Sequence, residues 1–377
     1  MAEASAGHPE LLRRLVDEIR AEGPVTFARF MDVALNDPVH GYYASGAARL
    51  GRGGDFFTAV DVGPAFGACL ARQLVEMDAL LDRPKPFRYV ECGAGRGFLA
   101  RDLTGTLEAE SPELARRIAL TLIDASSGMR AAAAALMPVA EVAAAPGASG
   151  GAAGCVVAVE LFDALPVHRV RRRGDGLREV RVGEVGGRLV EVEAPAGDEL
   201  RAWAAAYGAA PALDDEAEIC LSMRPTLAGL AASVDRGFVV IVDYGHEASR
   251  MFGPAHRRGT LMAYHRHHAH EDYLARVGEQ DLTAHVNLTA LRREAEACGL
   301  TTAGVTTQDR FLIANGILEG LDADDGGSLA ATKRRLQVKQ LIHPDGMGTA
   351  FKVAIFSKGM APPPTVRGVS DPFARWP

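Results

Sequence analysis

The sequence predicts an α/β fold: a seven-stranded, mostly parallel sheet, with a helical N-terminal extension and an insertion after the fourth strand. From Pro86 onward, short apolar runs alternate with helical stretches, which is typical of strand and crossover-helix units. The chain before that point has helical periodicity, and residues 166–235 break the alternation. With 377 residues, one large domain with insertions and two smaller domains are both open.

The N-terminal extension, residues 1–84, is predicted to be mainly helical. Apolar residues from Leu11 to Ile19 recur at helical spacing with charges between them, which indicates an amphipathic helix. Thr26 can cap a second helix, which Asp37-Pro38 would end. A third helix is expected over residues 64–81, because Pro64 favours a helix start.

The predicted strands and helices make up one domain, residues 85–361, followed by an extended tail, residues 362–377. The expected strands are Phe87 to Cys92, Ala119 to Asp124, Val139 to Ala143, Cys155 to Glu160, Gly237 to Asp243, Leu300 to Thr306 and Thr349 to Ser357. Within the insertion at 166–235, alternating apolar and polar runs indicate β-hairpins, and helices are expected to follow them.

A glycine-rich loop follows the first strand of this domain. The strand runs into Glu91, after which Gly93, Gly95 and Gly97 occupy alternate positions before a helix that begins near Phe98. Glycines let the backbone turn sharply and let a ligand approach it at the strand ends of a parallel sheet. Asp124, at the end of the next strand, can accept hydrogen bonds from a ribose diol. Together they predict a cofactor that contains adenosine.

Two residues favour S-adenosylmethionine over a dinucleotide. The dinucleotide fingerprint requires glycine at the sixth loop position, where this chain has Phe98. Glu91 suits a ligand that carries an ammonium and a sulfonium but no phosphate. A nicotinamide-dependent oxidoreductase and a glycine turn without any ligand remain as alternatives.

Motifs along nearly the whole chain, roughly residues 10 to 358, occur in the order seen in the MidA family, which the sequence resembles. They are Gly41-Tyr42-Tyr43, Gly54-Asp55-Phe56-x-Thr58, Phe66-Gly67, Glu91-x-Gly93-x-Gly95-x-Gly97, Asp124-x-Ser126, Glu160-x-x-Asp163-Ala164-Leu165-Pro166, Asp243-Tyr244-Gly245, Gly259-Thr260-Leu261 and Asp281-Leu282-Thr283-Ala284-His285-Val286.

The resemblance implies a Rossmann-like class I methyltransferase fold with S-adenosylmethionine as methyl donor. The mitochondrial member of the family is an arginine methyltransferase that assists assembly of respiratory complex I, so the resemblance implies symmetric dimethylation of a protein arginine. It assigns the Glu91–Gly97 loop to the methionine part of the cofactor and Asp124 to the ribose. Two positions depart from the family: Ala94 replaces a common Pro, and Val159 replaces a common Asn.

Glu160 and Asp163, at the end of the fourth strand, are the predicted catalytic residues. A pair of carboxylates can bind a planar guanidinium through hydrogen bonds and can accept the proton that it loses. The alternative is that Asp163 caps a turn and Glu160 only binds the cofactor.

Three further groups of residues complete the predicted site. Asp55 and Thr58 belong to a polar loop that is expected to cover the cofactor, although the same loop could simply join two helices. Ser126 is expected beside the cofactor. Asp243, Tyr244 and His285 are expected to bind the substrate, although Tyr244 could equally serve packing.

The histidines between His265 and His270, with His285 beyond them, raise the alternative of a metal site. A polar loop around a peptide acceptor is preferred, because methyl transfer needs no metal; no metal is predicted. The basic run Val170 to Arg173 is interpreted as a solvated strand edge. With a net charge of -7, no nucleic-acid partner is expected.

The expected location is the cytoplasm. The N-terminus lacks the pattern of a signal or transit peptide, no run is apolar enough to span a membrane, and the five cysteines are scattered. The expected partner is a protein acceptor, and a homodimer is also considered. Two alternative functions remain: a small-molecule methyltransferase, and a non-catalytic assembly factor that retains the fold.

Overall fold

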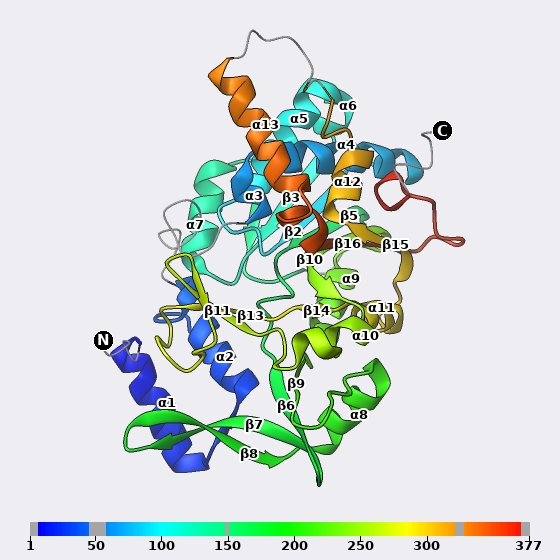
Figure 1. The fold of residues 1–377 in the computed structure, drawn as a ribbon. Helices are drawn as coiled ribbons and strands as arrows, with labels where there is room; N and C mark the ends of the chain where they lie inside the picture. Colours follow the sequence, from blue (N-terminus) through cyan, green and yellow to red (C-terminus); the bar gives the residue numbers. More distant parts are fainter. Residues whose placement is uncertain (1–6, 45–57, 148–150, 320, 322–327, 371–377) are drawn as a thin grey trace. The chain divides into compact units, whose positions relative to one another are not determined.

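The computed structural model describes residues 7–44, 58–147, 151–319, 321 and 328–370. The chain divides into two compact units (Figure 1). Unit 1 comprises Met1–Phe56, Phe162–Pro225 and Gly245–Arg293, and unit 2 comprises Phe57–Leu161, Thr226–Tyr244 and Glu294–Pro377. Each unit is described by itself.

Unit 2 is built on a mostly parallel sheet with the strand order β15-β16-β10-β5-β2-β3-β4. These strands are β2 (Phe87–Cys92), β3 (Ile118–Ile123), β4 (Glu141–Ala143), β5 (Ala153–Val159), β10 (Arg236–His246), β15 (Thr301–Thr307) and β16 (Phe351–Lys358). Neighbours from β10 to β4 are parallel, and β16 is antiparallel to β10 and β15. All seven predicted strands are present. In the described residues β14 (Val286–Asn287) adds an eighth, by pairing with the last two residues of β10.

Helices cover one face of this sheet with a large apolar core. They include α3 (Ala59–Val62), α4 (Ala65–Leu80), α5 (Phe98–Glu110), α6 (Pro112–Ala115), α7 (Ser127–Leu136), α12 (Gln308–Ala314), α13 (Leu329–Ile342) and α14 (Met347–Ala350). A further helix, α9 (Met223–Ala232), belongs to unit 2 from Thr226 onward. Alternate strand residues such as Phe87 and Tyr89 pack with Phe66 of α4 and Leu103 of α5. Because side chains alternate across a strand, Glu91 shares their face.

The end of the chain packs on unit 2. A short 3-10 helix, Arg367–Val369, lies within the predicted tail, and Val366 before it is buried. The amide of Gly368 donates to Oε1 of Gln73 on α4 at 2.9 Å. These described tail residues therefore have fixed contacts.

Unit 1 combines N-terminal helices with antiparallel strands. Its helices are α1 (Pro9–Glu22), α2 (Phe27–Asn36), α8 (Asp198–Tyr207), α10 (Ala248–Met251), the 3-10 helix η2 (Pro254–His256) and α11 (Leu288–Ala297), which extends into unit 2. Its strands are β1 (Val25–Thr26), β6 (His168–Arg173), β7 (Gly176–Val185), β8 (Arg188–Pro195), β9 (Glu216–Ile219), β11 (Met262–His265), β12 (His268–His270) and β13 (Asp281–Thr283). Thr26 caps α2 as predicted, since its Oγ1 accepts from the Arg29 amide at 3.1 Å.

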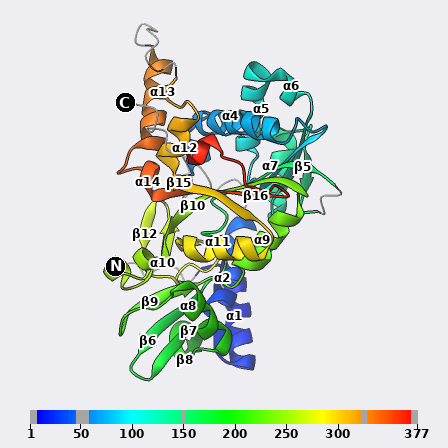
Figure 2. The same ribbon diagram turned by 90° about the vertical axis from the view of Figure 1, so that its right-hand side faces the viewer.

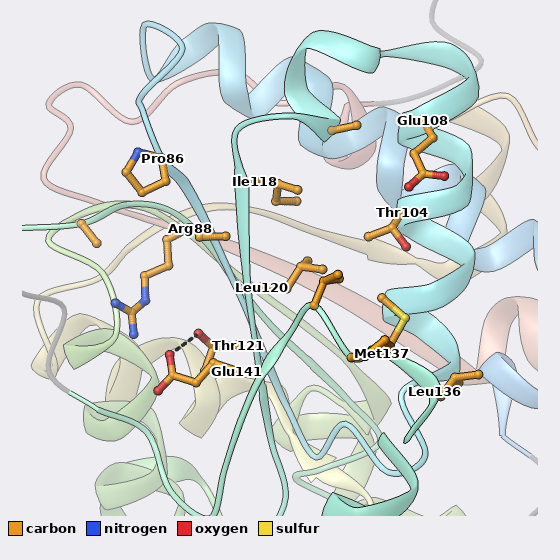
Figure 3. Close-up of a pocket in the computed structure, with 15 residues that line it drawn as sticks. Pro86, Arg88, Thr104, Glu108, Ile118, Leu120, Thr121, Leu136, Met137 and Glu141 are labelled. Carbon is orange, nitrogen blue, oxygen red and sulfur yellow. Dashed lines mark hydrogen bonds between the residues drawn. The ribbon is translucent and has the colours of Figure 1, made fainter. Parts of the chain in front are cut away.

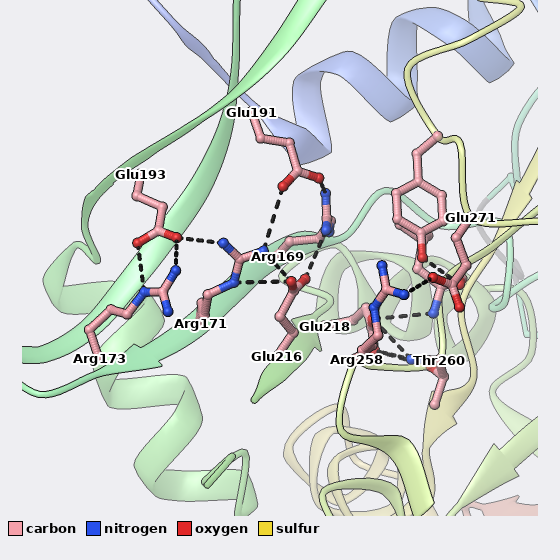
Figure 4. Close-up of polar contacts among 12 residues, drawn as sticks. Arg169, Arg171, Arg173, Glu191, Glu193, Glu216, Glu218, Arg258, Thr260 and Glu271 are labelled. Atoms are coloured by element: carbon pink, nitrogen blue, oxygen red, sulfur yellow. Dashed lines mark hydrogen bonds and ion pairs between the residues drawn. The ribbon is translucent and has the colours of Figure 1, made fainter. Parts of the chain in front are cut away.

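The predicted insertion between β5 and β10 contains the expected hairpins, in which β6, β7 and β8 lie side by side (Figure 2). Three arginines of β6 are paired with glutamates (Figure 4). Arg169 is 4% exposed and binds Glu216 at 2.8 Å, while Arg171 and Arg173 bind Glu193 at 2.5 and 2.6 Å. Carboxylates thus neutralise much of the basic run.

Within the described residues, no helix is both long enough and apolar enough to cross a membrane.

Candidate active site

The glycine-rich loop after β2 turns through three left-handed backbone conformations. The φ angles of Gly93, Gly95 and Gly97 are +74°, +52° and +78°, a region that disfavours residues with a Cβ. The amides of Gly93 and Ala94 donate to the carbonyl of Ile123 at 2.9 and 3.0 Å, which fixes the loop to the end of β3. A Cβ on Gly95 would meet no atom within 4 Å, so open space lies beside the loop. A ligand can therefore approach the bare backbone there.

Asp124 lies beside this loop at the end of β3. Its Oδ2 accepts from the Gly95 amide at 2.9 Å, and its Oδ1 accepts from the Ser126 amide at 2.8 Å. Each carboxylate oxygen has two lone pairs, so the group can still accept from a ribose diol. Ser126 caps α7, because its Oγ accepts from the Met129 amide at 3.3 Å. Burial raises the pKa of Asp124, and the two amide donors oppose that shift.

Glu91 is a buried carboxyl at the end of β2, with 4% of its surface exposed. Its Oε2 accepts from the Tyr89 hydroxyl at 2.9 Å. Burial raises the pKa of Glu91 to about 8, and the charge of Asp124 adds to the rise. Burying a charged carboxylate is costly, so the ammonium of a ligand would stabilise the charged form of Glu91. The residue fits the positively charged end of S-adenosylmethionine.

Thr58, the last residue of the predicted cover loop, lies within the described residues, whereas Asp55 lies outside them. The Thr58 and Asp61 side chains form a capping box at the start of α3. Asp61 also binds Arg96 of the glycine loop at 2.8 Å. This ion pair ties α3 to the cofactor loop. Sequence alone does not reveal this ion pair, because the two residues are far apart in the chain.

Glu160 follows β5 at the same sheet edge as the glycine loop, because β5 lies parallel and next to β2. Its φ angle is +52°, unusual for a residue other than glycine and costing about 1–3 kcal/mol. Two hydrogen bonds hold it there: its amide donates to the Val242 carbonyl at 2.8 Å, and its Oε1 accepts from the Ala59 amide at 2.9 Å. Strain of this kind is concentrated at functional sites.

Asp163 belongs to unit 1, whereas Glu160 belongs to unit 2. Asp163 is 3% exposed, and its carbonyl accepts from the Ala284 amide at 2.9 Å. A second buried acid, Asp281, accepts from the Tyr43 hydroxyl at 2.9 Å. Burial raises the pKa of Tyr43, and the charges of Asp281 and Asp163 raise it further. Tyr43 and Asp281 were not predicted as site residues, although both stand in the quoted motifs.

The three predicted substrate residues have different surroundings. Asp243 is 3% exposed and accepts through Oδ1 from the Tyr244 amide at 2.9 Å. The Tyr244 ring packs on Phe351, with ring centroids 3.9 Å apart, so this tyrosine does contribute to packing. His285 lies in unit 1, where its amide donates to Thr260 Oγ1 at 3.0 Å.

A separate pocket of about 730 Å³ lies at the opposite ends of strands β2 and β3 (Figure 3). Pro86, Arg88, Ile118 and Glu141 are among its lining residues. It contains none of the predicted site residues, and it lies at the amino ends of the strands rather than at the ligand-binding carboxyl ends. It is therefore not the candidate active site.

A family model described as "Putative S-adenosyl-L-methionine-dependent methyltransferase" matches residues 69–306, more than half of the chain. The chain belongs to this methyltransferase family. The matched residues include the glycine loop, Asp124, Glu160 and Asp243, so the predicted cofactor is confirmed. The protein is an S-adenosylmethionine-dependent methyltransferase.

Two solved structures from Burkholderia thailandensis share the fold. The first is a proposed methyl transferase bound to S-adenosylhomocysteine, 31% identical, with a TM-score of 0.86, covering 97% of this chain and 95% of that one. The second is a native structure of an uncharacterised protein, 29% identical, with a TM-score of 0.83, covering 96% and 94%. These likenesses confirm the predicted α/β methyltransferase fold.

Curated relatives include the mouse and human proteins named "Protein arginine methyltransferase NDUFAF7, mitochondrial". The mouse protein is 28% identical over 90% of this chain and 83% of its own length, and the human protein is 27% identical over 90% and 82%. Their mitochondrial names contradict the predicted cytoplasmic location. That prediction was wrong because it relied on the lack of a recognisable leader pattern, which does not fix a compartment.

Proposed function

We propose that this methyltransferase methylates arginine in a protein and produces symmetric dimethylarginine. The names of the curated relatives support a protein arginine as acceptor. The observation that carries the proposal is Glu160, a carboxylate residue with a strained backbone that follows β5 at the same sheet edge as the glycine loop. A guanidinium is the acceptor that a carboxylate recognises best, because its planar fork matches the two oxygens.

Specific residues are proposed for each part of the site. Glu91 and the backbone at Gly93, Gly95 and Gly97 hold the methionine part of the cofactor, Asp124 holds the ribose, and Ser126 positions Asp124. Thr58 positions α3 beside the loop, and Asp55 belongs to the cover. Asp163, Asp243, Tyr244 and His285 are proposed for the acceptor side.

The bound cofactor supplies an electrophilic methyl group on a sulfonium. The task of the protein is to align the acceptor nitrogen with that methyl group and to exclude water. We assign the alignment to Glu160, whose carboxylate holds the guanidinium and draws positive charge away from the attacking nitrogen. The nitrogen loses one proton as the new C–N bond forms and the C–S bond breaks, and we assign the acceptance of this proton to Glu160.

The test compares Glu160→Gln with Glu108→Gln, a control on the exposed side of α5. Methyl-labelled cofactor is added to cell lysate that has been separated by size, and labelled macromolecules are digested to identify the methylated residue. We expect label in protein arginine, and turnover by E160Q reduced by at least about 100-fold with S-adenosylhomocysteine binding retained. Near-normal turnover by E160Q would remove Glu160 from the mechanism. Label confined to small metabolites would favour a small-molecule acceptor.

A further inference from the structure

Three histidines from separate segments of unit 1 come together in the fold. His246 ends β10, His256 ends the 3-10 helix η2, and His285 lies between β13 and β14. One nitrogen from each ring lies within 4.8 Å of one from each of the others, and all three side chains are partly buried. Within the described residues this is the one such group of potential metal ligands, and it includes none of the histidines from His265 to His270.

The spacing of the three rings fits a shared metal ion. The centroid separations are 5.2, 5.2 and 6.1 Å, with interplanar angles of 26°, 54° and 67°. By comparison, His8 and His40 in the same unit form a true stack at 3.9 Å and 17°. Zn–N bonds of about 2.0–2.1 Å at tetrahedral angles place imidazole centroids about 5 Å apart. A small inward shift of His256 and His285 would complete the arrangement.

The hydrogen bond made by the His256 ring is also the kind that metal-binding histidines make. Its Nδ1 lies 3.2 Å from the carbonyl oxygen of Arg250, and a carbonyl can only accept a hydrogen bond. Nδ1 therefore donates this hydrogen bond, which leaves Nε2 as the nitrogen that the neutral ring can offer to a metal. Metal-binding histidines are typically oriented in this way, by donating their other ring N–H to a carbonyl or carboxylate.

The backbone holds the other two histidines in register. Gly245 and His246 pair with Val286 and Asn287 in parallel strands, and the His285 amide donates to Thr260 Oγ1 at 3.0 Å. A Cβ on Gly245 would lie 2.7 Å from the Val286 carbonyl, so the close approach of these strands requires glycine there. Both imidazoles therefore stand on well-supported backbone, as a metal site needs.

We propose that His246, His256 and His285 bind one Zn²⁺ ion through their ring nitrogens, with water as the fourth ligand. Three neutral nitrogen donors favour zinc over Mg²⁺ or Ca²⁺, which require oxygen ligands. The ion fastens η2 and the segment before β14 to the end of β10. Its role is structural: it fixes the position of His285, which is also proposed for the acceptor side, and it takes no part in the methyl transfer itself.

The test uses full-length protein without a polyhistidine tag, stripped with a chelator. Zn²⁺ is titrated into wild type, into His256→Gln and into the control His268→Gln, each in the presence of a chromophoric chelator that competes for the ion. His268 is an exposed residue of β12 and therefore serves as the control. We expect one Zn²⁺ per chain in wild type and H268Q, and binding at least about tenfold weaker in H256Q. Equal binding by all three proteins, or none by wild type, would overturn the proposal.

A second measurement does not depend on the folding of any variant. Zn²⁺ should raise the thermal unfolding temperature of wild type by mass action, whereas Mg²⁺ at the same concentration should not. An unfolding temperature that does not respond to Zn²⁺ would also contradict the proposed site.

Discussion

The cofactor loop of unit 2 and the side-chain clusters of unit 1 are assembled in different ways. Glu91 to Gly97 are consecutive, and Asp124 joins them from the adjacent strand. The acids Asp163 and Asp281 and the three clustered histidines come from distant parts of the chain. The cofactor loop is therefore readable from a local motif, whereas the side-chain clusters of unit 1 depend on tertiary folding.

The largest effect is expected from a change in the loop itself, Gly93→Val. A β-branched residue at φ +74° is strained, and its Cβ would lie 3.3 Å from Leu161 Cδ1. We expect calorimetry to show that S-adenosylhomocysteine binds about 10- to 100-fold more weakly. A left-handed backbone costs a residue with a Cβ about 1–2 kcal/mol, and the branched side chain of valine adds to this cost.

Gly105→Ala is the matched control for that change. Gly105 lies inside α5, where a new Cβ meets no atom within 4 Å, so the exchange should leave binding intact and stabilise the helix by up to about 1 kcal/mol. Unchanged binding by G93V would show that the conformation of the loop does not matter to the cofactor.

The sequence was sufficient for the parts of the molecule with local signals. Apolar runs located all seven main strands, and β2 matches its predicted bounds. The two-residue β14 was missed because so short a strand has no periodicity, and it exists only by pairing with β10. The Arg96–Asp61 ion pair and the Tyr43–Asp281 hydrogen bond were missed for a related reason, because tertiary contacts leave no local pattern.

A smaller effect is expected from pH, through Glu91. Burial raises its pKa in the folded protein from 4.5 to about 8, so the folded state binds the proton more tightly than the unfolded state. In the absence of cofactor, this group's contribution to stability should therefore fall as pH rises from about 4.5 to about 8. The ammonium group of S-adenosylhomocysteine needs the charged carboxylate, so the affinity for this ligand should increase by up to about tenfold per pH unit as pH is raised towards 8.

Calorimetry on wild type and Glu91→Gln across this pH range checks the second effect. The variant should bind more weakly and lose most of the pH dependence, because its amide does not titrate. Parallel pH profiles for the two proteins would mean that another group controls binding.

The central claim is that the loop from Glu91 to Gly97, together with Asp124, holds the cofactor. Calorimetric titration of wild type and Asp124→Asn with S-adenosylhomocysteine and with NAD tests it most directly, with Asp82→Asn as an exposed control. We predict one site for S-adenosylhomocysteine, weakened about tenfold or more in D124N and unchanged in D82N, and no binding of NAD. Equal affinity in wild type and D124N, or binding of NAD instead, would contradict the account.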